Sequence, residues 1–145
     1  MVDTLVAEIH LKGGEPAAAV TVLAESLRRH PDFRPLTYAL VDAQLAAGNP
    51  RAALDVVAPA TQLTPSDPRL WSLQAKAYAA LGKRLQQHRS QAELYALNGQ
   101  YSAAVTQLEI AQKAGDGDFY ELSTVDARLR EMRALHAEEI KRRRN

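Results

Sequence analysis

Apolar side chains recur along this chain every three or four residues, which is the period of an amphipathic helix. Residues 2–12 and residues 16–29 each carry such a stripe, and Gly13 and Gly14 separate them. Pro16 lies in the first turn of the second helix, where a missing amide costs nothing. The inward-facing positions predicted for these two helices are Leu5, Val6, Ile9, Val20, Leu23 and Leu27.

Proline and glycine divide the following residues in the same way. Pro35 and Pro50 stand where a third and a fourth helix would begin, and Gly48 falls between these helices. Asp67 can cap a fifth helix that Pro68 leads. The chain therefore reads as a series of short helices joined by tight turns.

Pro59 is the exception, because it falls inside a helical stripe and not at its start. In that place it removes a backbone hydrogen bond and costs about 3 kcal/mol unless the helix kinks. The sequence therefore predicts a bend or a break between Val56 and Pro59.

Several of these residues return after 34 positions. The interval separates Gly14 from Gly48 and Gly48 from Gly82, Pro31 from Pro65, and Ala19 from Ala53. A period of 34 residues matches the helix-turn-helix unit of tetratricopeptide arrays, in which each unit buries its apolar face only against its neighbours. The alanines lie where small side chains let two helices pack closely.

The segment before Gly82 carries the most specific part of this resemblance. Trp71, Ala75 and Tyr78 have the Trp, small-residue and aromatic spacing of the first helix of a tetratricopeptide repeat. Aromatic side chains at this spacing are typical of a core. The resemblance implies an all-α fold class, an α-α superhelix of about eight helices in antiparallel pairs.

The 34-residue register slips after Gly82, because the next glycine of this type, Gly99, is only 17 residues away. The simplest interpretation is an unbroken up-and-down stack in which the helix at residues 84–97 has the sequence of a repeat start. Disorder or a missing helix is the alternative. We predict one domain over residues 1–145, with repeats at about 1–33, 34–67, 68–98 and 99–118.

A long charged helix is predicted to close the array at about residues 119–141, after a turn at Asp116-Gly117-Asp118. An array needs a polar outer face at its end, and a helix with one narrow apolar stripe supplies it. The stripe consists of Val125, Leu129, Met132 and Ile140.

Composition narrows the classes of partner. The 18 basic residues nearly balance the 17 acidic ones, so there is no global attraction to nucleic acid or membrane. With no cysteine, the chain can form neither a disulfide nor a thiolate metal site. No apolar run approaches the roughly 20 residues that span a bilayer, and no signal peptide opens the chain. We expect no membrane insertion, and we expect the chain to be a fragment whose signal, if any, lies outside it.

A narrower resemblance lies in the second half. It is carried by Gln91-Ala92-Glu93, Tyr95, Gly99, Ala103-Ala104, Gln107-Leu108, Asp118-Phe119-Tyr120, Ser123 and Ala127-Arg128-Leu129. These residues resemble the C-terminal tetratricopeptide region of BepA-like periplasmic zinc metallopeptidases of the Ste24-like class. The resemblance implies a periplasmic domain that recruits partners or substrates. Its partners would be its own protease domain and the outer-membrane β-barrel assembly machinery.

The catalytic motif of such a protease is not found in these residues. A zincin needs two histidines four residues apart with a Glu beside the first, and His10, His30, His88 and His136 have no such neighbour. His136 and Glu139 share one side of the last helix, but a surface pair at this spacing is typically a solvated contact. There is also no nucleophile elbow, phosphate loop or dinucleotide fingerprint. We predict that this chain is not an enzyme and holds no metal or cofactor.

The first helices of tetratricopeptide repeats line a concave groove, and alignment on the glycines predicts which residues face it. The Lys and Asn of a carboxylate clamp are replaced here by Thr4, Glu8, Ala39 and Asp42. Mixed charges suit a polar, selective groove for a protein or peptide; the alternative is that each residue is a solvated helix side. The predicted protein-binding residues are Glu8, Lys12, Tyr38, Asp42, Arg69, Ser72 and Lys76.

Two further functions stay open. The basic run at residues 141–144 could bind phosphates, which makes an RNA-contacting helical repeat the first alternative. Cations are favoured at a helix C-terminus by the helix dipole, so a frayed, solvated helix end is the preferred interpretation and no nucleic-acid partner is expected. A regulatory repeat module of another enzyme is the second alternative.

Overall fold

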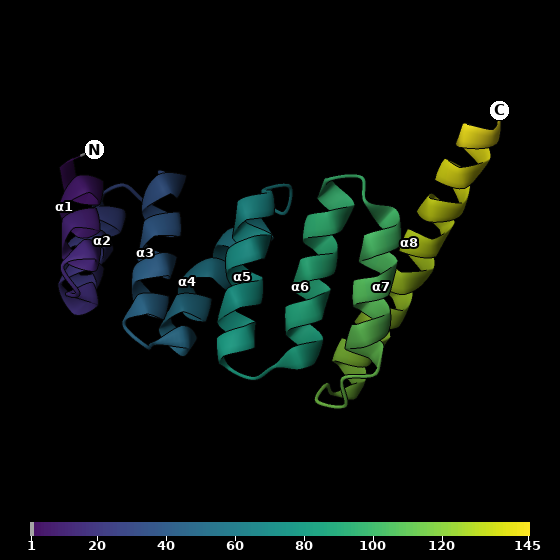
Figure 1. The fold of residues 1–145 in the computed structure, drawn as a ribbon. Coiled ribbons are helices and arrows are strands. Elements are labelled where there is room, and N and C mark those ends of the chain that lie inside the picture. Colours follow the sequence, from purple (N-terminus) through teal and green to yellow (C-terminus); the bar gives the residue numbers. More distant parts are fainter. Residues whose placement is uncertain (1) are drawn as a thin grey trace. The chain divides into compact units, whose positions relative to one another are not determined.

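The computed structural model describes residues 2–145, and these residues form eight α-helices and no strand (Figure 1). The predicted all-α class of about eight helices is confirmed. The helices are α1 (Val2–Lys12), α2 (Pro16–Arg29), α3 (Arg34–Ala46), α4 (Pro50–Leu63), α5 (Pro68–Ala80), α6 (Arg84–Leu97), α7 (Tyr101–Gln112) and α8 (Phe119–Arg144). None of these helices is both long and apolar enough to cross a membrane.

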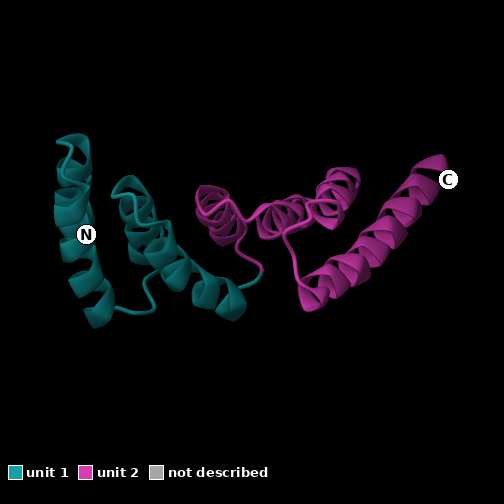
Figure 2. Cartoon of the chain, turned by 90° about the horizontal axis from the view of Figure 1, so that it is seen from below, with its two compact units in different colours: residues 1–65 teal, residues 66–145 magenta. Residues whose placement is uncertain are grey.

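The helices group into two compact units, residues 1–65 with α1 to α4 and residues 66–145 with α5 to α8 (Figure 2). Within each unit every helix packs on the next one in the chain. In the first unit α1 also contacts α3, and in the second α6 also contacts α8. Each unit is thus a stack of antiparallel neighbours with some contact between alternate helices.

The periodic glycines end helices in one recurring way. Gly14, Gly48, Gly82 and Gly99 all have φ between +71° and +77°, which is the left-handed region that glycine enters without strain. The residue after each glycine donates its N–H to the carbonyl five residues earlier, as in a Schellman motif. These bonds join Glu15 to His10, Asn49 to Gln44, Lys83 to Tyr78 and Gln100 to Tyr95.

The half-period slip therefore has a structural counterpart. The turn after α6 is the same as the turns after α1, α3 and α5, although α6 directly follows α5 in the stack. α6 is a complete helix with the same bounds as predicted, so the alternative of disorder or a missing helix is wrong. α6 also contacts α8, the next helix but one in the chain, as α1 contacts α3.

The predicted helix starts are confirmed at Pro16, Pro50 and Pro68, whereas α3 begins at Arg34, one residue before its proline. The Asp67 carboxylate caps α5 by accepting a hydrogen bond of 2.9 Å from the Arg69 N–H.

Pro59 does not break its helix, because α4 runs without interruption from Pro50 to Leu63. The predicted break is therefore wrong, and a bend at this place stays a prediction. Packing can hold such a helix together, since Val57 and Thr61 on either side of the proline are buried. The Thr61 hydroxyl also donates to the Val57 carbonyl at 2.8 Å.

The first unit has its core between α1, α2 and α3. The core residues are Ala7, Ala19, Leu23, Leu36, Leu40 and Ala43. Leu23 is buried as predicted, and Val20 and Leu27 pack against the core while partly buried. The prediction that Leu5 and Ile9 face inward is wrong, because their exposed fractions are 58% and 62%. The small Ala7 takes the buried place on α1, which brings this helix close to α2.

The second unit has its core between α6, α7 and α8. The core residues are Leu85, Ala92, Ala104, Leu108, Ala111, Val125, Leu129 and Met132. Three of the four residues in the predicted α8 stripe are therefore buried. The prediction is wrong for Ile140, which is 41% exposed. The helix also continues to Arg144, three residues beyond its predicted end.

Candidate functional site

Four of the predicted binding residues lie on two helices that contact each other in the first unit. Glu8 and Lys12 are exposed on α1, whereas Tyr38 and Asp42 are half-buried on α3. Each pair is spaced by four residues, so its two side chains lie on one side of their helix. The structure thus brings these four residues onto neighbouring helices, and their role in binding stays a prediction.

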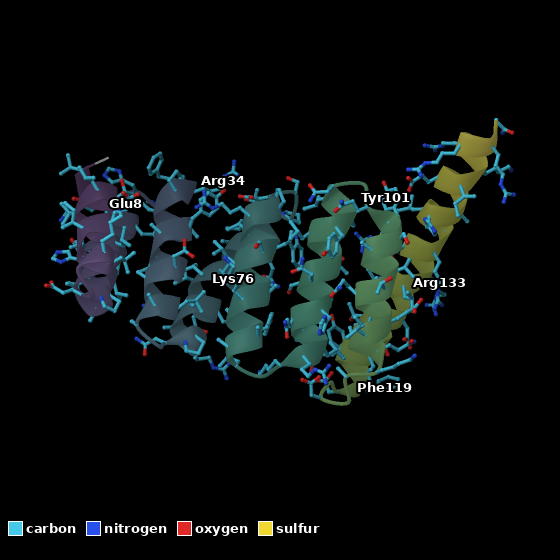
Figure 3. The ribbon with its side chains drawn as sticks, viewed as in Figure 1. Glu8, Arg34, Lys76, Tyr101, Phe119 and Arg133 are labelled. Atoms are coloured by element: carbon cyan, nitrogen blue, oxygen red, sulfur yellow. The ribbon has the colours of Figure 1, made fainter. Side chains whose placement is uncertain are left out.

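The other three predicted residues lie on α5 in the second unit. Arg69, Ser72 and Lys76 follow the three-and-four spacing of one helix face. Arg69 and Lys76 are exposed, and Ser72 is half-buried. Figure 3 labels Lys76 along α5. A single groove shared by all seven residues stays a prediction.

The two aromatic residues of the repeat signature are not in the fully buried core. Trp71 and Tyr78 are both half-buried. The prediction of a core position is therefore only partly right, because smaller side chains occupy the buried positions of this helix. Those positions are Leu70, Leu73, Gln74, Ala75 and Ala77.

A hollow between α6 and α8, lined by side chains of both charges, was not predicted from the sequence. It has a volume of about 360 Å³, and we call it the α6–α8 hollow. Its lining residues are Arg89, Glu93, Tyr120, Ser123, Thr124, Ala127, Arg128 and Glu131. Glu93 and Arg128 belong to the segments that carry the narrower family resemblance, but no periodicity indicates that they meet. The hollow belongs entirely to the second unit.

A bidentate ion pair between Arg128 and Glu93 forms part of the lining of the α6–α8 hollow. Arg128 donates from Nε to Glu93 Oε1 at 2.7 Å and from Nη2 to Glu93 Oε2 at 2.8 Å. Its third nitrogen, Nη1, donates to Glu131 Oε2 at 2.6 Å. Bidentate pairs of this kind are strong and fix the orientation of both groups. Arg128 is thus held rigidly between two carboxylates.

The pKa of Arg128 is raised above its ordinary value, chiefly by its hydrogen bonds to Glu93. Partial burial acts in the opposite direction, and the negative charges of Glu93 and Glu131 outweigh it. Arg128 therefore stays charged at every pH at which the protein is folded.

Arg89 lines the same hollow, but its hydrogen bonding differs from that of Arg128. Its Nε is buried and has no hydrogen-bond partner. Its Nη1 makes only a long contact of 3.5 Å to Gln86 Oε1. A buried donor without an acceptor is unfavourable, and each such group in a folded protein calls for a physical explanation.

The histidines do not gather into a metal site. His88 Nδ1 lies 2.8 Å from Gln107 Oε1, and His10 Nδ1 lies 3.1 Å from Glu15 Oε2. His136 has a buried Nδ1 without a partner. Within residues 2–145, no three His, Cys, Asp or Glu side chains are grouped so that they could hold a metal ion.

The basic C-terminal run is helical and exposed. α8 continues to Arg144, and the exposure of this run agrees with the preferred interpretation of a solvated helix end. Fraying of this end stays a prediction. Arg143 pairs with Glu139 at 2.6 Å, and Arg142 lies 3.7 Å from Glu138. These pairs at four-residue spacing stabilise a last helical turn and reduce the positive charge it offers to a phosphate.

Comparisons with known proteins agree with this architecture. Residues 10–77 match the tetratricopeptide repeat family. The chain is also 30% identical over 132 residues to the beta-barrel assembly-enhancing protease of Yersinia pestis, which covers 91% of this chain. The chain spans 27% of the length of that relative. The resemblance expected from the sequence, to the repeat region of such a protease, is confirmed.

Proposed function

We propose that this chain is a protein-interaction scaffold that performs no catalysis of its own, since residues 10–77 match the tetratricopeptide repeat family. The observation that carries this proposal is the recurrence of one helical hairpin, closed each time by a left-handed glycine. Such repeats stack into extended surfaces that bind other polypeptides.

The finer proposal is that the scaffold serves a periplasmic zinc metallopeptidase in the assembly and quality control of outer-membrane proteins. It is supported by the similarity to the beta-barrel assembly-enhancing protease, which extends over 91% of this chain. Under this proposal the partners are the protease domain of the same protein, the β-barrel assembly machinery and β-barrel substrates.

The proposed contact residues are those on the first helix of each repeat. In the first unit they are Glu8, Lys12, Tyr38 and Asp42, and in the second they are Arg69, Ser72 and Lys76. Exposed charges of both signs disfavour a uniformly charged ligand such as nucleic acid and suit a polypeptide of mixed polarity.

Photocrosslinking tests this proposal. A benzophenone amino acid replaces Glu8 or Lys76 in turn, and matched controls carry it at Arg51 on α4 and Thr106 on α7, which are also exposed. The probe is a urea-denatured outer-membrane β-barrel protein diluted into the mixture. We expect crosslinks at Glu8 and Lys76 and few at the controls. Equal crosslinking at all four positions would contradict a specific binding surface.

The two alternatives give different outcomes. An RNA-contacting repeat would shift a structured RNA in a gel, and the shift would depend steeply on the salt concentration. A regulatory module of another enzyme would have, in the complete reading frame, a catalytic domain without a His-Glu-x-x-His motif.

A further inference from the structure

We propose that the α6–α8 hollow binds an aromatic side chain of a partner polypeptide, which stacks on the flat face of the Arg128 guanidinium. This inference rests on the proposed scaffold function and extends it to residues outside the seven proposed contact residues. It follows from the position of the hollow in the repeat, from its charge and from its shape.

The hollow occupies the place in its unit that the proposed contact residues occupy in theirs. Arg89 and Glu93 precede Gly99, the glycine after α6, by ten and six residues. The residues at the same distances before Gly48 and Gly82 are Tyr38 with Asp42 and Ser72 with Lys76. α6 also contacts α8 as α1 contacts α3. The hollow therefore corresponds to the proposed contact surface of the other repeats.

The lining of the hollow has no net charge. It contains two arginines, Arg89 and Arg128, and two carboxylates, Glu93 and Glu131. Both carboxylates accept hydrogen bonds from Arg128, at 2.6 to 2.8 Å. A charged group that entered the hollow would lose hydration without meeting an unpaired counter-charge. The hollow therefore favours an uncharged ligand.

Arg128 offers such a ligand the face of its guanidinium. Its three nitrogens all donate to carboxylates, so the edge of the planar group is engaged. The side chain is nevertheless 32% exposed, and it lines the hollow. A guanidinium face attracts the face of an aromatic ring, and a rigidly held one loses little freedom when it stacks.

Short side chains of α8 leave the space for a ring beside Arg128. Tyr120 and Arg128 are eight residues apart, which is about 12 Å along the helix. The lining residues between them are Ser123, Thr124 and Ala127. The Thr124 hydroxyl already donates to the Tyr120 carbonyl at 3.0 Å. Tyr120 is 78% exposed and provides a second aromatic surface two turns before Arg128.

The partner proposed above carries side chains of this kind. The strands of outer-membrane β-barrels have girdles of aromatic residues, which are accessible while the barrel is unfolded. The ligand is therefore an aromatic side chain of an extended segment. An aliphatic side chain of equal size would fill the same space but could not stack on the guanidinium.

An NMR titration of the whole ¹⁵N-labelled chain with two uncharged peptides tests the inference. The first is acetyl-Gly-Ser-Phe-Ser-Gly-amide, and the second has cyclohexylalanine in place of Phe. The two side chains have nearly equal size, but only the first is aromatic. We expect at least about threefold tighter binding of the Phe peptide. We also expect that this peptide alone moves the Arg128 Nε–H signal upfield, because the proton then lies over the face of a ring.

Variants of α8 locate the site without disturbing the Arg128 ion pairs. Tyr120→Ala should weaken binding of the Phe peptide by at least about threefold, and Ala127→Leu should abolish it by filling the hollow. Phe119→Ala is the matched control, because Phe119 is 85% exposed beside Tyr120 but does not line the hollow (Figure 3). It should keep the affinity within about twofold.

A thermal melt verifies that each variant is folded, and Tyr120→Ala keeps the test valid if Ala127→Leu is not. Equal binding of the two peptides to the wild type would overturn the inference. So would an unmoved Arg128 Nε–H signal, or a loss in Phe119→Ala as large as that in Tyr120→Ala. Crosslinks at Glu8 and Lys76 that persist in Tyr120→Ala would show that the scaffold function stands even if this site does not.

Discussion

Asp116, in the loop between α7 and α8, caps helix α6, because its carboxylate accepts a hydrogen bond of 3.0 Å from the Leu85 N–H. The Arg84 N–H donates to the same carboxylate. These amides belong to the first turn of α6, where no intrahelical acceptor exists. Lys83, the N-cap residue of α6, provides no side-chain hydrogen bond. The loop before α8 thus supplies the cap that the α5–α6 turn lacks.

Removal of this cap should destabilise the second unit. For Asp116→Ala we expect a loss of about 0.5 to 1 kcal/mol in the free energy of unfolding, at the lower end of the range for N-caps because the carboxylate is exposed. Urea denaturation followed by circular dichroism measures it. Asp55→Ala, an exposed position on α4, is the control and should change stability by less than about 0.5 kcal/mol.

The contribution of Asp116 should depend on pH. Desolvation pushes the pKa of Asp116 upward, but the hydrogen bonds from the Leu85 and Arg84 amides and the charge of Arg84 outweigh it, so the pKa is lowered. A lowered pKa in the folded state means that the stabilisation is complete above the unfolded value of about 3.9 and is lost as the pH falls through the folded value. The stability difference between wild type and Asp116→Ala should therefore be constant from pH 7 to pH 5 and shrink below about pH 3.9. A difference that grows on acidification would refute this linkage.

Gly117 is required for space and not for its backbone angle. A Cβ at this position would lie 2.2 Å from Leu85 Cδ1, and Leu85 is only 1% exposed. Gly117→Ala should therefore overpack the loop against α6 and cost about 1 to 3 kcal/mol in unfolding free energy. A double-mutant cycle isolates the cause: in a Leu85→Ala background the cost of Gly117→Ala should be clearly smaller. Equal costs in the two backgrounds would mean that the clash is not the source.

The Arg128–Glu93 pair should matter more than the neighbouring Arg128–Glu131 pair. Glu93→Gln removes a partner whose side chain is only 15% exposed and leaves Arg128 without its bidentate acceptor, so we expect a loss of about 1 to 3 kcal/mol. Glu131→Gln removes a partner that is 60% exposed and should cost less than about 1 kcal/mol. Thermal and urea unfolding of both variants measure this order, and the reverse order would contradict it.

Close helix packing in the first unit can be tested at Ala53. This residue has no exposed surface, so Ala53→Leu should overpack the helices and cost about 1 to 3 kcal/mol. Lys76→Ala, on an exposed position of α5, should leave stability within about 0.5 kcal/mol. Partner binding should respond in the opposite way, with the larger loss for Lys76→Ala.

The sequence predicts local structure here more fully than tertiary contacts. The helix ends before Gly14, Gly48 and Gly82 and the helix starts at Pro16, Pro50 and Pro68 follow from glycine and proline chemistry, which acts over a few residues. The prediction of burial on α1 is wrong because Ala7, and neither Leu5 nor Ile9, lies in the core that this helix shares with α2 and α3. Periodicity locates an apolar face, but the approach of a neighbouring helix decides which part of that face is covered.

The α6–α8 hollow could not be predicted for the same reason. Glu93 and Arg128 are 35 residues apart, and Asp116 lies 31 residues from Leu85. These pairs depend on how α8 returns to pack on α6, which the spacing of residues along one helix does not encode. The narrower family resemblance marked both Glu93 and Arg128 but gave no sign that they touch.

Hydrogen–deuterium exchange with and without a bound polypeptide tests the central claim most directly. The chain is measured alone and with a saturating amount of the denatured β-barrel protein, and peptides covering each helix are compared. The account predicts slower exchange in α1, α3 and α5, which carry the seven proposed contact residues, and little change in α2 and α4. Slower exchange confined to α2 and α4, or no change in any helix, would contradict it.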